Sequence, residues 1–163
     1  MIDPLHKIRG FTLIEMMVVV VIVGILASAT LPLIHLGEQR LKERELRQAL
    51  RDIRSALDDY RRAGELGQIE RKVGQSGYPP NLRVLVEGVT DVRSPDKRKL
   101  YFLRRIPHDP FNLDKVDDSA ENGSWGVRSY ASPPDEPKPG DDVYDIFSLS
   151  EGIGSNGIPY RRW

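Results

Sequence analysis

A long apolar run near the N-terminus constrains this chain more than any other feature. It begins at Phe11 and continues to about Leu36, and its central part, 16–34, contains 19 residues without a charge. As a helix that part would be about 28 Å long, which is close to the thickness of the hydrocarbon core of a bilayer. Val and Ile favour a strand in water, but a membrane favours a helix because backbone polar groups must be satisfied within the segment. The run therefore predicts a transmembrane helix over 11–36.

The charges before this run indicate its orientation. Residues 1–10 are short and polar, with Lys7 and Arg9 near the end. Positive charges stay on the cytoplasmic side of a spanning helix, so the N-terminus is expected in the cytoplasm and the rest of the chain on the other side. Two ordinary explanations compete. A cleaved secretory leader would use the Ala-Ser-Ala at 27–29, although the run continues past it, and a simple signal anchor would not need Glu15.

The carboxylate of Glu15 is unusual for such a segment. An unpaired charge near the end of a spanning helix costs about 2–3 kcal/mol unless it reaches the interface, and such residues are functional by default. The apolar run contains no Lys or Arg. A cation for Glu15 must therefore come from outside the run.

The six residues from Gly10 to Glu15, Gly-Phe-Thr-Leu-Ile-Glu, resemble the cleavage and methylation motif of type IV prepilins and pseudopilins. The resemblance implies that a prepilin peptidase cuts after Gly10 and that the new N-terminal Phe11 is N-methylated. It also implies that Glu15 pairs with the N-terminal amine of a neighbouring subunit. Pro32 matches a proline that commonly interrupts this helix in the family, and it removes one helical hydrogen bond. The implied partners are other pseudopilins in a filament, the peptidase and an inner-membrane assembly platform.

Residues 37–63 continue the helix with a different pattern. Apolar side chains recur at spacings of three and four, which predicts a helix with one buried stripe; the stripe contains Leu46, Leu50, Ile53, Leu57 and Tyr60, widened by Ala49 and Ala56. Another face carries arginines at positions 40, 44, 47, 51 and 54. These arginines could bind phosphate, but the interleaved acids favour a solvated or subunit-facing surface.

Residues 64–163 predict a small globular domain. Asn81 is placed to cap a short helix, and alternating patterns predict strands over 125–131 and 142–149. The expected fold class is α+β. A long N-terminal helix, with a transmembrane half and an amphipathic half, would pack on a small antiparallel β-sheet domain, as in pilins.

The C-terminal half also resembles the major pseudopilins of type II secretion systems. The motifs, in the order seen there, are Tyr78-Pro79, the stretch 106–111, Trp125-Gly126, Tyr130 and the stretch 145–148. Cysteine is absent, whereas type IV major pilins usually close their tail with a disulfide. The resemblance implies a structural subunit of a pseudopilus, anchored by one span in the inner membrane with a periplasmic C-terminal domain. The alternatives are a type IV pilus subunit for adhesion or motility, a DNA-uptake pilin and an unrelated anchored domain.

Major pseudopilins usually bind calcium in an acidic, glycine-rich loop near the C-terminus. The corresponding stretch here, 148–157, has one carboxylate, Glu151, whereas calcium takes about six to eight oxygen ligands. With Asp142 and Asp145 it makes up the candidate calcium site, but a solvated acidic turn is the preferred interpretation. No other cofactor is expected.

The composition favours neither nucleic-acid binding nor catalysis. Lys and Arg number 24, as do Asp and Glu, so no global basic field attracts a nucleic acid. His108-Asp109 could begin a catalytic triad or a metal site. The other histidines, His6 and His35, lie in the leader and at the membrane edge, so no cluster can form, and no enzymatic activity is expected.

Overall fold

The structure is a computed structural model that describes residues 11–71, 74–112 and 120–163; for 28–36 it describes the helix but not the side chains. The chain divides into two compact units, Met1–Gln39 and Arg40–Trp163. The predicted leader, 1–10, lies outside the described residues. So do the side chain of Pro32 and any effect it has on its surroundings.

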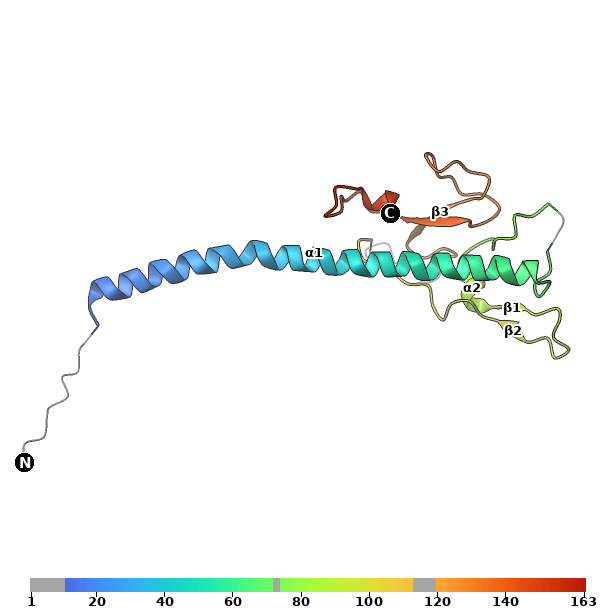
Figure 1. The fold of residues 1–163 in the computed structure, drawn as a ribbon, viewed down its shortest axis with the longest axis horizontal. Helices are drawn as coiled ribbons and strands as arrows, with labels where there is room; N and C mark the ends of the chain where they lie inside the picture. The colour runs from blue at the N-terminus through green and yellow to red at the C-terminus, as the bar shows by residue number, and fades with distance from the viewer. Residues whose placement is uncertain (1–10, 72–73, 113–119) are drawn as a thin grey trace, which may run out of the picture. The chain divides into compact units, whose positions relative to one another are not determined.

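One helix, α1 (Leu13–Glu65), passes through both units (Figure 1). It spans 53 residues and covers the two consecutive segments in which the sequence predicts a helix. The second unit adds a short helix and two small antiparallel sheets. The α+β class is therefore confirmed at this level.

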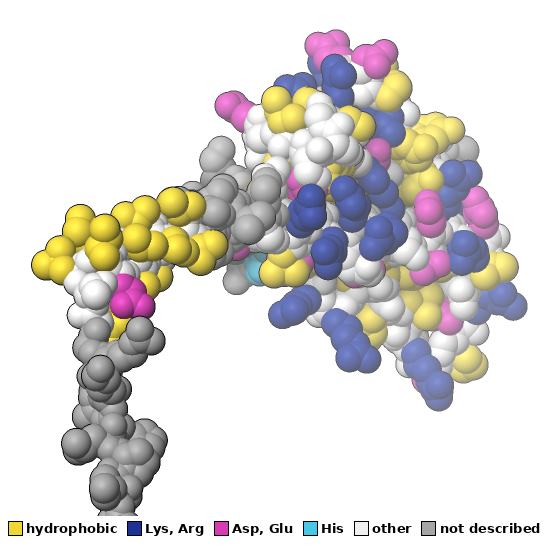
Figure 2. Space-filling view, turned by 60° about the vertical axis from the view of Figure 1, so that its left-hand side comes forward, with side chains coloured by type: hydrophobic (Ala, Val, Ile, Leu, Met, Phe, Trp, Pro, Cys, Tyr) yellow, Lys and Arg dark blue, Asp and Glu magenta, His cyan; other side chains and the backbone are white. Residues whose placement is uncertain are grey.

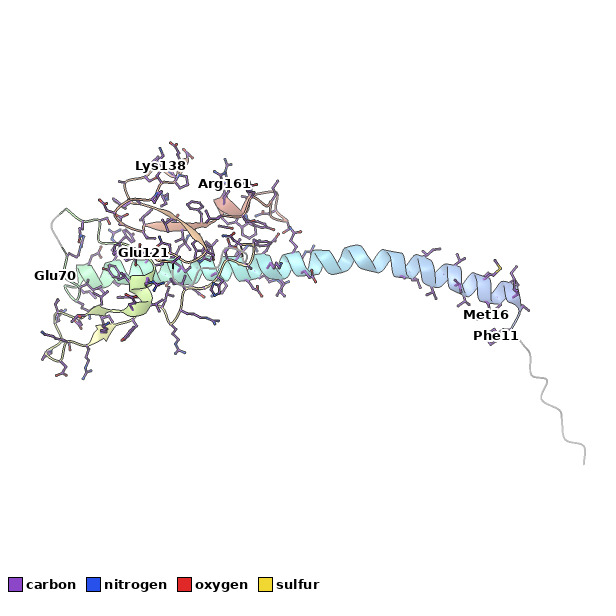
Figure 3. The ribbon with its side chains drawn as sticks, turned by 180° about the vertical axis from the view of Figure 1, so that it is seen from behind. Phe11, Met16, Glu70, Glu121, Lys138 and Arg161 are labelled. Carbon is purple, nitrogen blue, oxygen red and sulfur yellow. The ribbon has the colours of Figure 1, made fainter. Side chains whose placement is uncertain are left out.

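In the first unit, the large apolar side chains of α1 that the structure describes are exposed. The large apolar side chains between Phe11 and Leu26 are each at least 48% exposed, the lowest value being that of Val19. Figure 3 shows Phe11 and Met16 projecting from this end of the helix. A helix that is apolar all round is normally buried in lipid or in other protein.

None of the helices, as far as the described residues go, has an apolar stretch long enough to cross a membrane.

The core of the second unit forms along the predicted apolar stripe of α1. Leu46, Leu50, Ile53 and Leu57 are at most 2% exposed. They belong to one cluster with buried residues of the later part of the chain, which include Leu82, Leu85, Trp125, Val143, Ile146 and Tyr160. Burial of each large aliphatic side chain contributes about 1.5–3 kcal/mol. The stripe therefore fixes which face of α1 the C-terminal domain covers.

The short helix α2 (Arg83–Glu87) has Leu82 at its N-cap position, one residue after the predicted Asn81. The Oδ1 atom of Asn81 accepts a hydrogen bond from the amide of Val84 at 3.2 Å. This bond satisfies one of the amides left without a partner at the start of a helix. It places Leu82 and Leu85, both fully buried, against α1.

The larger sheet pairs β3 (Trp125–Arg128) with β4 (Asp145–Ser148) in antiparallel register, with Gly126 opposite Phe147. Both strands are shorter than predicted. The amide of Val143 donates to the carbonyl of Pro79 instead of to β3, so β4 begins only after it. A Cβ at Gly126 would overlap the ring of Phe147, which explains a glycine inside a strand.

The smaller sheet pairs β1 (Val89–Thr90) with β2 (Lys99–Leu100). Each strand has only two residues, and the alternation that identifies a strand needs a longer stretch. A final 3₁₀ turn, η2 (Tyr160–Arg162), contributes Tyr160 to the core.

Candidate functional site

Glu15 lies in the first turn of α1, next to Thr12, and both side chains are exposed. The Oγ1 atom of Thr12 accepts a hydrogen bond from the amide of Glu15 at 3.3 Å, and Oε2 of Glu15 accepts one from the amide of Thr12 at 3.5 Å. This reciprocal pair is a capping box, which satisfies two amides at the helix start. The spacing Thr-x-x-Glu is the known sequence signal of this motif, although the sequence predictions did not include it.

The capping box leaves Glu15 able to bind a cation as well. A carboxylate offers about four acceptor positions, and Thr12 uses one of them. A negative charge is also favourable at the positive end of the helix dipole. Phe11, at 77% exposed, stands immediately before the capping box. Gly10 lies outside the described residues, and the roles assigned to Gly10, Phe11, Glu15 and Pro32 stay predictions.

Asp142, a calcium candidate, is engaged in the turn that links β3 to β4. Its Oδ1 atom accepts hydrogen bonds from the hydroxyl of Ser129 and from the amide of Tyr130, both at 2.8 Å. The carboxylate therefore fixes the turn after β3. Glu151, the candidate in the tail, is exposed.

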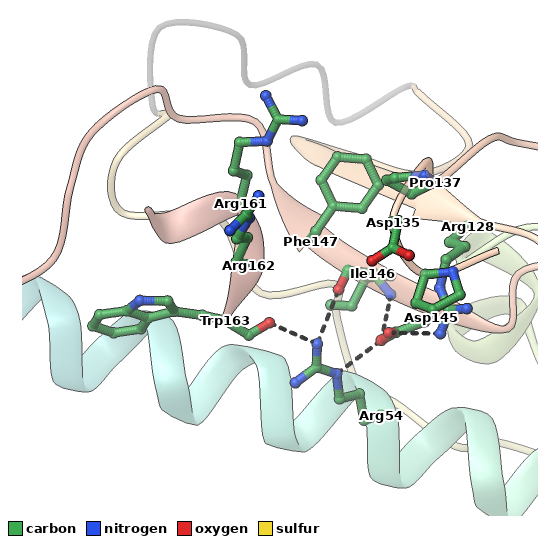
Figure 4. A pocket seen from close by; sticks show the side chains of 11 residues that line it. Arg54, Arg128, Asp135, Pro137, Asp145, Ile146, Phe147, Arg161, Arg162 and Trp163 are labelled. Atoms are coloured by element: carbon green, nitrogen blue, oxygen red, sulfur yellow. Dashed lines mark hydrogen bonds and ion pairs between the residues drawn. The ribbon is translucent and has the colours of Figure 1, made fainter. Parts of the chain in front are cut away.

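Asp145, the third calcium candidate, is held by two arginines (Figure 4). Its carboxylate accepts from Nε of Arg54 at 2.8 Å and from Nη2 of Arg128 at 3.3 Å. Arg54 also donates to the backbone oxygens of Ile146 at 3.2 Å and Trp163 at 2.9 Å. Both carboxylate oxygens thus bind protein cations, and Arg54 joins α1 to β4 by an ion pair and to the tail by a hydrogen bond.

These carboxylates do not gather into a metal site. Within the described ranges, no group of three or more His, Cys, Asp or Glu side chains is arranged to hold a metal ion. Calcium prefers several charged oxygens around one point. The described geometry instead gives Asp142 and Asp145 protein donors.

The tail is fastened to α1 by Glu43, which is only 2% exposed. Its carboxylate accepts hydrogen bonds from the amide and the hydroxyl of Ser155, each at 2.6 Å, and from the hydroxyl of Tyr160 at 3.2 Å. Nη2 of Arg47 lies 3.8 Å away. The four-residue spacing of Glu43 and Arg47 indicates only a surface ion pair on a helix, and the sequence predictions did not include this site. A signal was available, since Glu43 is three residues before Leu46 and therefore on the buried stripe.

Aromatic contacts complete the fastening of the tail. The ring of Tyr160 stacks on Phe111, with centroids 4.0 Å apart, and meets Trp163 edge-on at 5.1 Å. The guanidinium of Arg47 lies over the ring of Trp163 at 4.5 Å. The stretch 148–157, which corresponds to the calcium loop of the pseudopilins named above, is thus held at Ser155 by a helix carboxylate, and ring packing holds the residues that follow it.

In the dipeptide His108-Asp109, the aspartate forms hydrogen bonds that hold neighbouring segments together. Asp109 is fully buried, and its carboxylate accepts from the hydroxyl of Ser148 at 2.5 Å and from the amide of Phe111 at 2.9 Å. Its own amide donates to Ser124 Oγ at 2.9 Å. His108 is exposed. Asp109 therefore joins the loop before Phe111 to β4.

Two groups near the far end of α1 have displaced pKa values. Burial raises the pKa of Tyr60 above its ordinary value of 10.0. Hydrogen bonds to Tyr78 and to Glu65 raise the pKa of Arg61, so its guanidinium stays charged.

Known proteins are similar both to the N-terminal segment and to nearly the whole chain. Residues 5–31 match the family described as "Prokaryotic N-terminal methylation motif". The type II secretion system core protein G of Vibrio cholerae is 32% identical, over 98% of this chain and 94% of its own length. The core protein G of Pseudomonas aeruginosa is 34% identical, over 94% of both chains, and that of Dickeya chrysanthemi is 29% identical, over 91% of this chain and 92% of its own. No solved structure matches the chain significantly.

The similarity is not confined to the N-terminal motif. It extends through the second unit, where the buried stripe of α1, the β3–β4 sheet and the tail lie. With identities above 30% across more than nine-tenths of two relatives, the chain belongs to the family of type II secretion system core protein G.

Proposed function

We propose that this protein is a structural subunit of the pseudopilus, the filament of a type II protein secretion system. The observation that carries the proposal is the similarity to core protein G along nearly the whole chain, N-terminal methylation motif included. The protein is a structural component of a secretion system rather than an enzyme. Its shared ancestry with core proteins of that system disfavours the alternatives of an adhesion or motility pilus and of a DNA-uptake pilin.

The N-terminal segment would be processed and then serve as the anchor and the assembly helix. A prepilin peptidase would remove residues 1–10 by cutting after Gly10, and Phe11 would be N-methylated. Residues 11–36 would hold the subunit in the inner membrane by a single span, with the N-terminus cytoplasmic before cleavage. The high exposure of the apolar side chains from Phe11 to Leu26 supports this, because they need lipid or other subunits around them.

The remaining chain would form the periplasmic part. Residues 37–63 would continue the assembly helix, and 64–163 would form a pilin-like domain around it. The continuous helix α1 and the burial of its stripe in the second unit support this organisation. Calcium is not required in the proposal, because the tail is held by Glu43.

In the filament, Glu15 would bind the N-terminal ammonium of Phe11 from a neighbouring subunit. Support comes from its exposed position in the first turn of α1 and from the acceptor capacity that the capping box leaves. Pro32 would loosen the helix in the assembled state, since its ring removes one backbone hydrogen bond.

The test combines processing, assembly and secretion. Mass spectrometry of the mature protein should find an N-methylated Phe11. Overexpression with its secretion genes should give filaments that can be sheared from cells and seen by electron microscopy, and deletion of the gene should stop secretion. An intact Met1, or a cut near Ala29, would contradict the processing, and secretion without the gene would contradict the function.

A further inference from the structure

The part of α1 in the second unit carries a basic stripe along its exposed side. We use this name for Arg40, Arg44, Arg47, Arg51 and Arg54. Their spacings of four and three residues keep them on one face of the helix. All are exposed except Arg54, which is half-buried.

An acidic stripe runs beside it on the same helix. It consists of Glu45, Asp52 and Asp59, which are exposed and are spaced seven residues apart. At about 100° per residue, the two stripes are centred about 120° apart around the helix axis. The apolar stripe occupies the remaining side. Between Arg40 and Arg54 the two stripes therefore lie on different sides of α1, whereas the exposed Asp58, further along the helix, lies in line with the basic stripe.

The tail widens the basic stripe. Arg161 and Arg162 in η2 are exposed. Arg162 lines a shallow surface hollow together with Arg51 and Arg54. Figure 2 shows lysine and arginine side chains gathered on one face of the second unit. The basic surface is therefore built by two segments that are more than 100 residues apart in the sequence.

The arginines of this surface differ in how they are used within the subunit. Arg54 binds Asp145, and Arg47 binds Glu43 and Trp163. The side chains of Arg44 and Arg162 make no hydrogen bond or ion pair to the residues that the structure describes, and the same holds for Arg40 and Arg161. The repulsion between these neighbouring positive charges is not offset by hydrogen bonds or ion pairs of their own side chains. Binding of an anionic partner would therefore be favourable.

A second copy of this chain fits the basic stripe better than an external polyanion. Lys plus Arg equals Asp plus Glu over the chain, so a basic face implies acidic surface elsewhere on the same molecule. The acidic stripe repeats every seven residues, and the basic stripe repeats at the same interval, as in Arg44 and Arg51. Two parallel helices can therefore match their charges over several turns, as the flanking charges of coiled coils do. Glu45 makes no ion pair within the described part of the chain, so it remains available.

We propose that the basic stripe of one subunit binds the acidic stripe of a second copy in the filament. Since the two stripes are different surfaces, the contact is heterologous, and such contacts propagate into open filaments rather than closing as dimers. The contact would guide the lateral register of neighbouring subunits, because charge pairs act more on specificity and register than on raw affinity. The inference rests on the proposed function.

The experiment exchanges the charges of the two stripes in the full-length chain. Arg44→Glu with Arg51→Glu should lower the yield of sheared filaments at least about tenfold, since tenfold corresponds to only about 1.4 kcal/mol and facing like charges are penalised. Glu45→Arg with Asp52→Arg should have the same effect. The variant with all four changes restores opposite charges at the contact and should regain most of the parental yield.

A matched control reverses two arginines away from α1. Arg104 and Arg105 are exposed in the loop after β2, and Arg104→Glu with Arg105→Glu changes the net charge equally. This control should assemble like the parent. Protease resistance of the membrane-bound subunits monitors folding, and the recovery of the four-change variant would itself show that the altered helix still folds.

The outcomes separate this inference from the proposed function. Unchanged filaments from the Arg44/Arg51 variant would overturn the inference while leaving the pseudopilus assignment intact, and so would failure of the four-change variant to recover. Loss of salt-dependent binding to a duplex DNA probe, with assembly unaffected, would show that the stripe faces nucleic acid instead. If the parent forms no filament, the proposed function fails. Sedimentation of the solubilised full chain at low salt must then still show oligomers that the Arg44/Arg51 variant loses, or the inference fails too.

Discussion

Replacing Glu43 should destabilise the second unit strongly, because this one helix carboxylate binds the C-terminal tail. Glu43→Ala removes the carboxylate that accepts three hydrogen bonds. The amide and the hydroxyl of Ser155 donate to it at 2.6 Å each, and the hydroxyl of Tyr160 donates at 3.2 Å. The substitution also leaves the guanidinium of Arg47 without this carboxylate. Ser155 and Tyr160, which lose their acceptor, belong to the C-terminal segment that lies against α1.

The expected loss follows from these contacts. A hydrogen bond to a charged group contributes about 1.5–3 kcal/mol. The three bonds are not additive, because two of them come from Ser155 and all share one carboxylate. Each buried donor that is left without an acceptor costs about 1–3 kcal/mol. We therefore expect Glu43→Ala to lower the free energy of unfolding by about 3–5 kcal/mol, a large part of the roughly 5–15 kcal/mol of a typical domain.

The assay is urea denaturation of a fragment starting at Glu38, followed by circular dichroism. Glu43→Gln keeps one carbonyl acceptor and should lose less than Glu43→Ala. The matched control Glu45→Ala removes an exposed carboxylate two residues away and should change stability by no more than about 0.5 kcal/mol. A double-mutant cycle with Ser155→Ala should give a coupling of at least about 1 kcal/mol. A Glu43→Ala fragment as stable as the Glu45→Ala control would refute the argument.

Three further predictions concern the same fragment. It should be soluble and helical once the apolar run is removed, because the stripe of α1 already has its core in the second unit; an unfolded spectrum would show that the unit needs the assembly helix. Millimolar calcium should raise its melting temperature by less than about 2 °C, since a bound ion stabilises by mass action; Glu151→Ala tests the loop, whereas Asp145→Ala also breaks the pairs with Arg54 and Arg128. Burial raises the pKa of Tyr60, so its stabilising contribution is complete below the ordinary value of 10.0 and is lost as the pH rises through the higher pKa of the folded state. The free energy of unfolding should therefore fall less steeply with pH in this range in Tyr60→Phe than in the parent. The same slope in both proteins would show that Tyr60 does not cause the fall.

The sequence predicted those parts of the fold that local patterns encode. The recurrence of Leu46, Leu50, Ile53 and Leu57 identified the buried face of α1, and all four are core residues. A cap at Asn81 was predicted from its type and position; the N-cap position is Leu82, one residue later, but Asn81 does accept a hydrogen bond from the amide of Val84. These features depend on residues within one or two turns of each other, so periodicity and capping preference suffice to find them.

The contacts that fix the tail could not be predicted in the same way. Glu43 meets Ser155 across 112 positions of the sequence, and Arg54 meets Asp145 across 91. No local pattern states which loop returns to which turn of a helix. The burial of Glu43 was foreseeable from its spacing to Leu46, but its partners depend on the path of the whole domain. Asp145 was only a calcium candidate in the sequence, and its two arginine partners could not be predicted for the same reason, because they come from α1 and β3.

Glu15 combines a local role with a predicted intermolecular one, and two substitutions separate them. Glutamine can replace glutamate in a capping box, so Glu15→Gln should preserve the start of α1 while removing the negative charge. Glu15→Leu removes both the cap and the charge. If assembly depends on a charge pair with the ammonium of Phe11 from a neighbour, both variants leave that ammonium uncompensated, at a cost of about 3–5 kcal/mol per subunit.

Both variants should therefore insert into the membrane and be cleaved after Gly10, yet neither should give sheared filaments by electron microscopy. The capping box alone makes a different prediction. Losing a cap costs only about 0.5–2 kcal/mol, so Glu15→Gln would assemble normally and Glu15→Leu would be impaired only in part. Thr12→Ala provides the complementary variant, since it removes the hydroxyl that accepts from the amide of Glu15 but keeps the carboxylate. If Thr12→Ala assembles while Glu15→Gln does not, the charge decides assembly; the opposite pattern would mean that Glu15 acts in the filament through the start of its own helix.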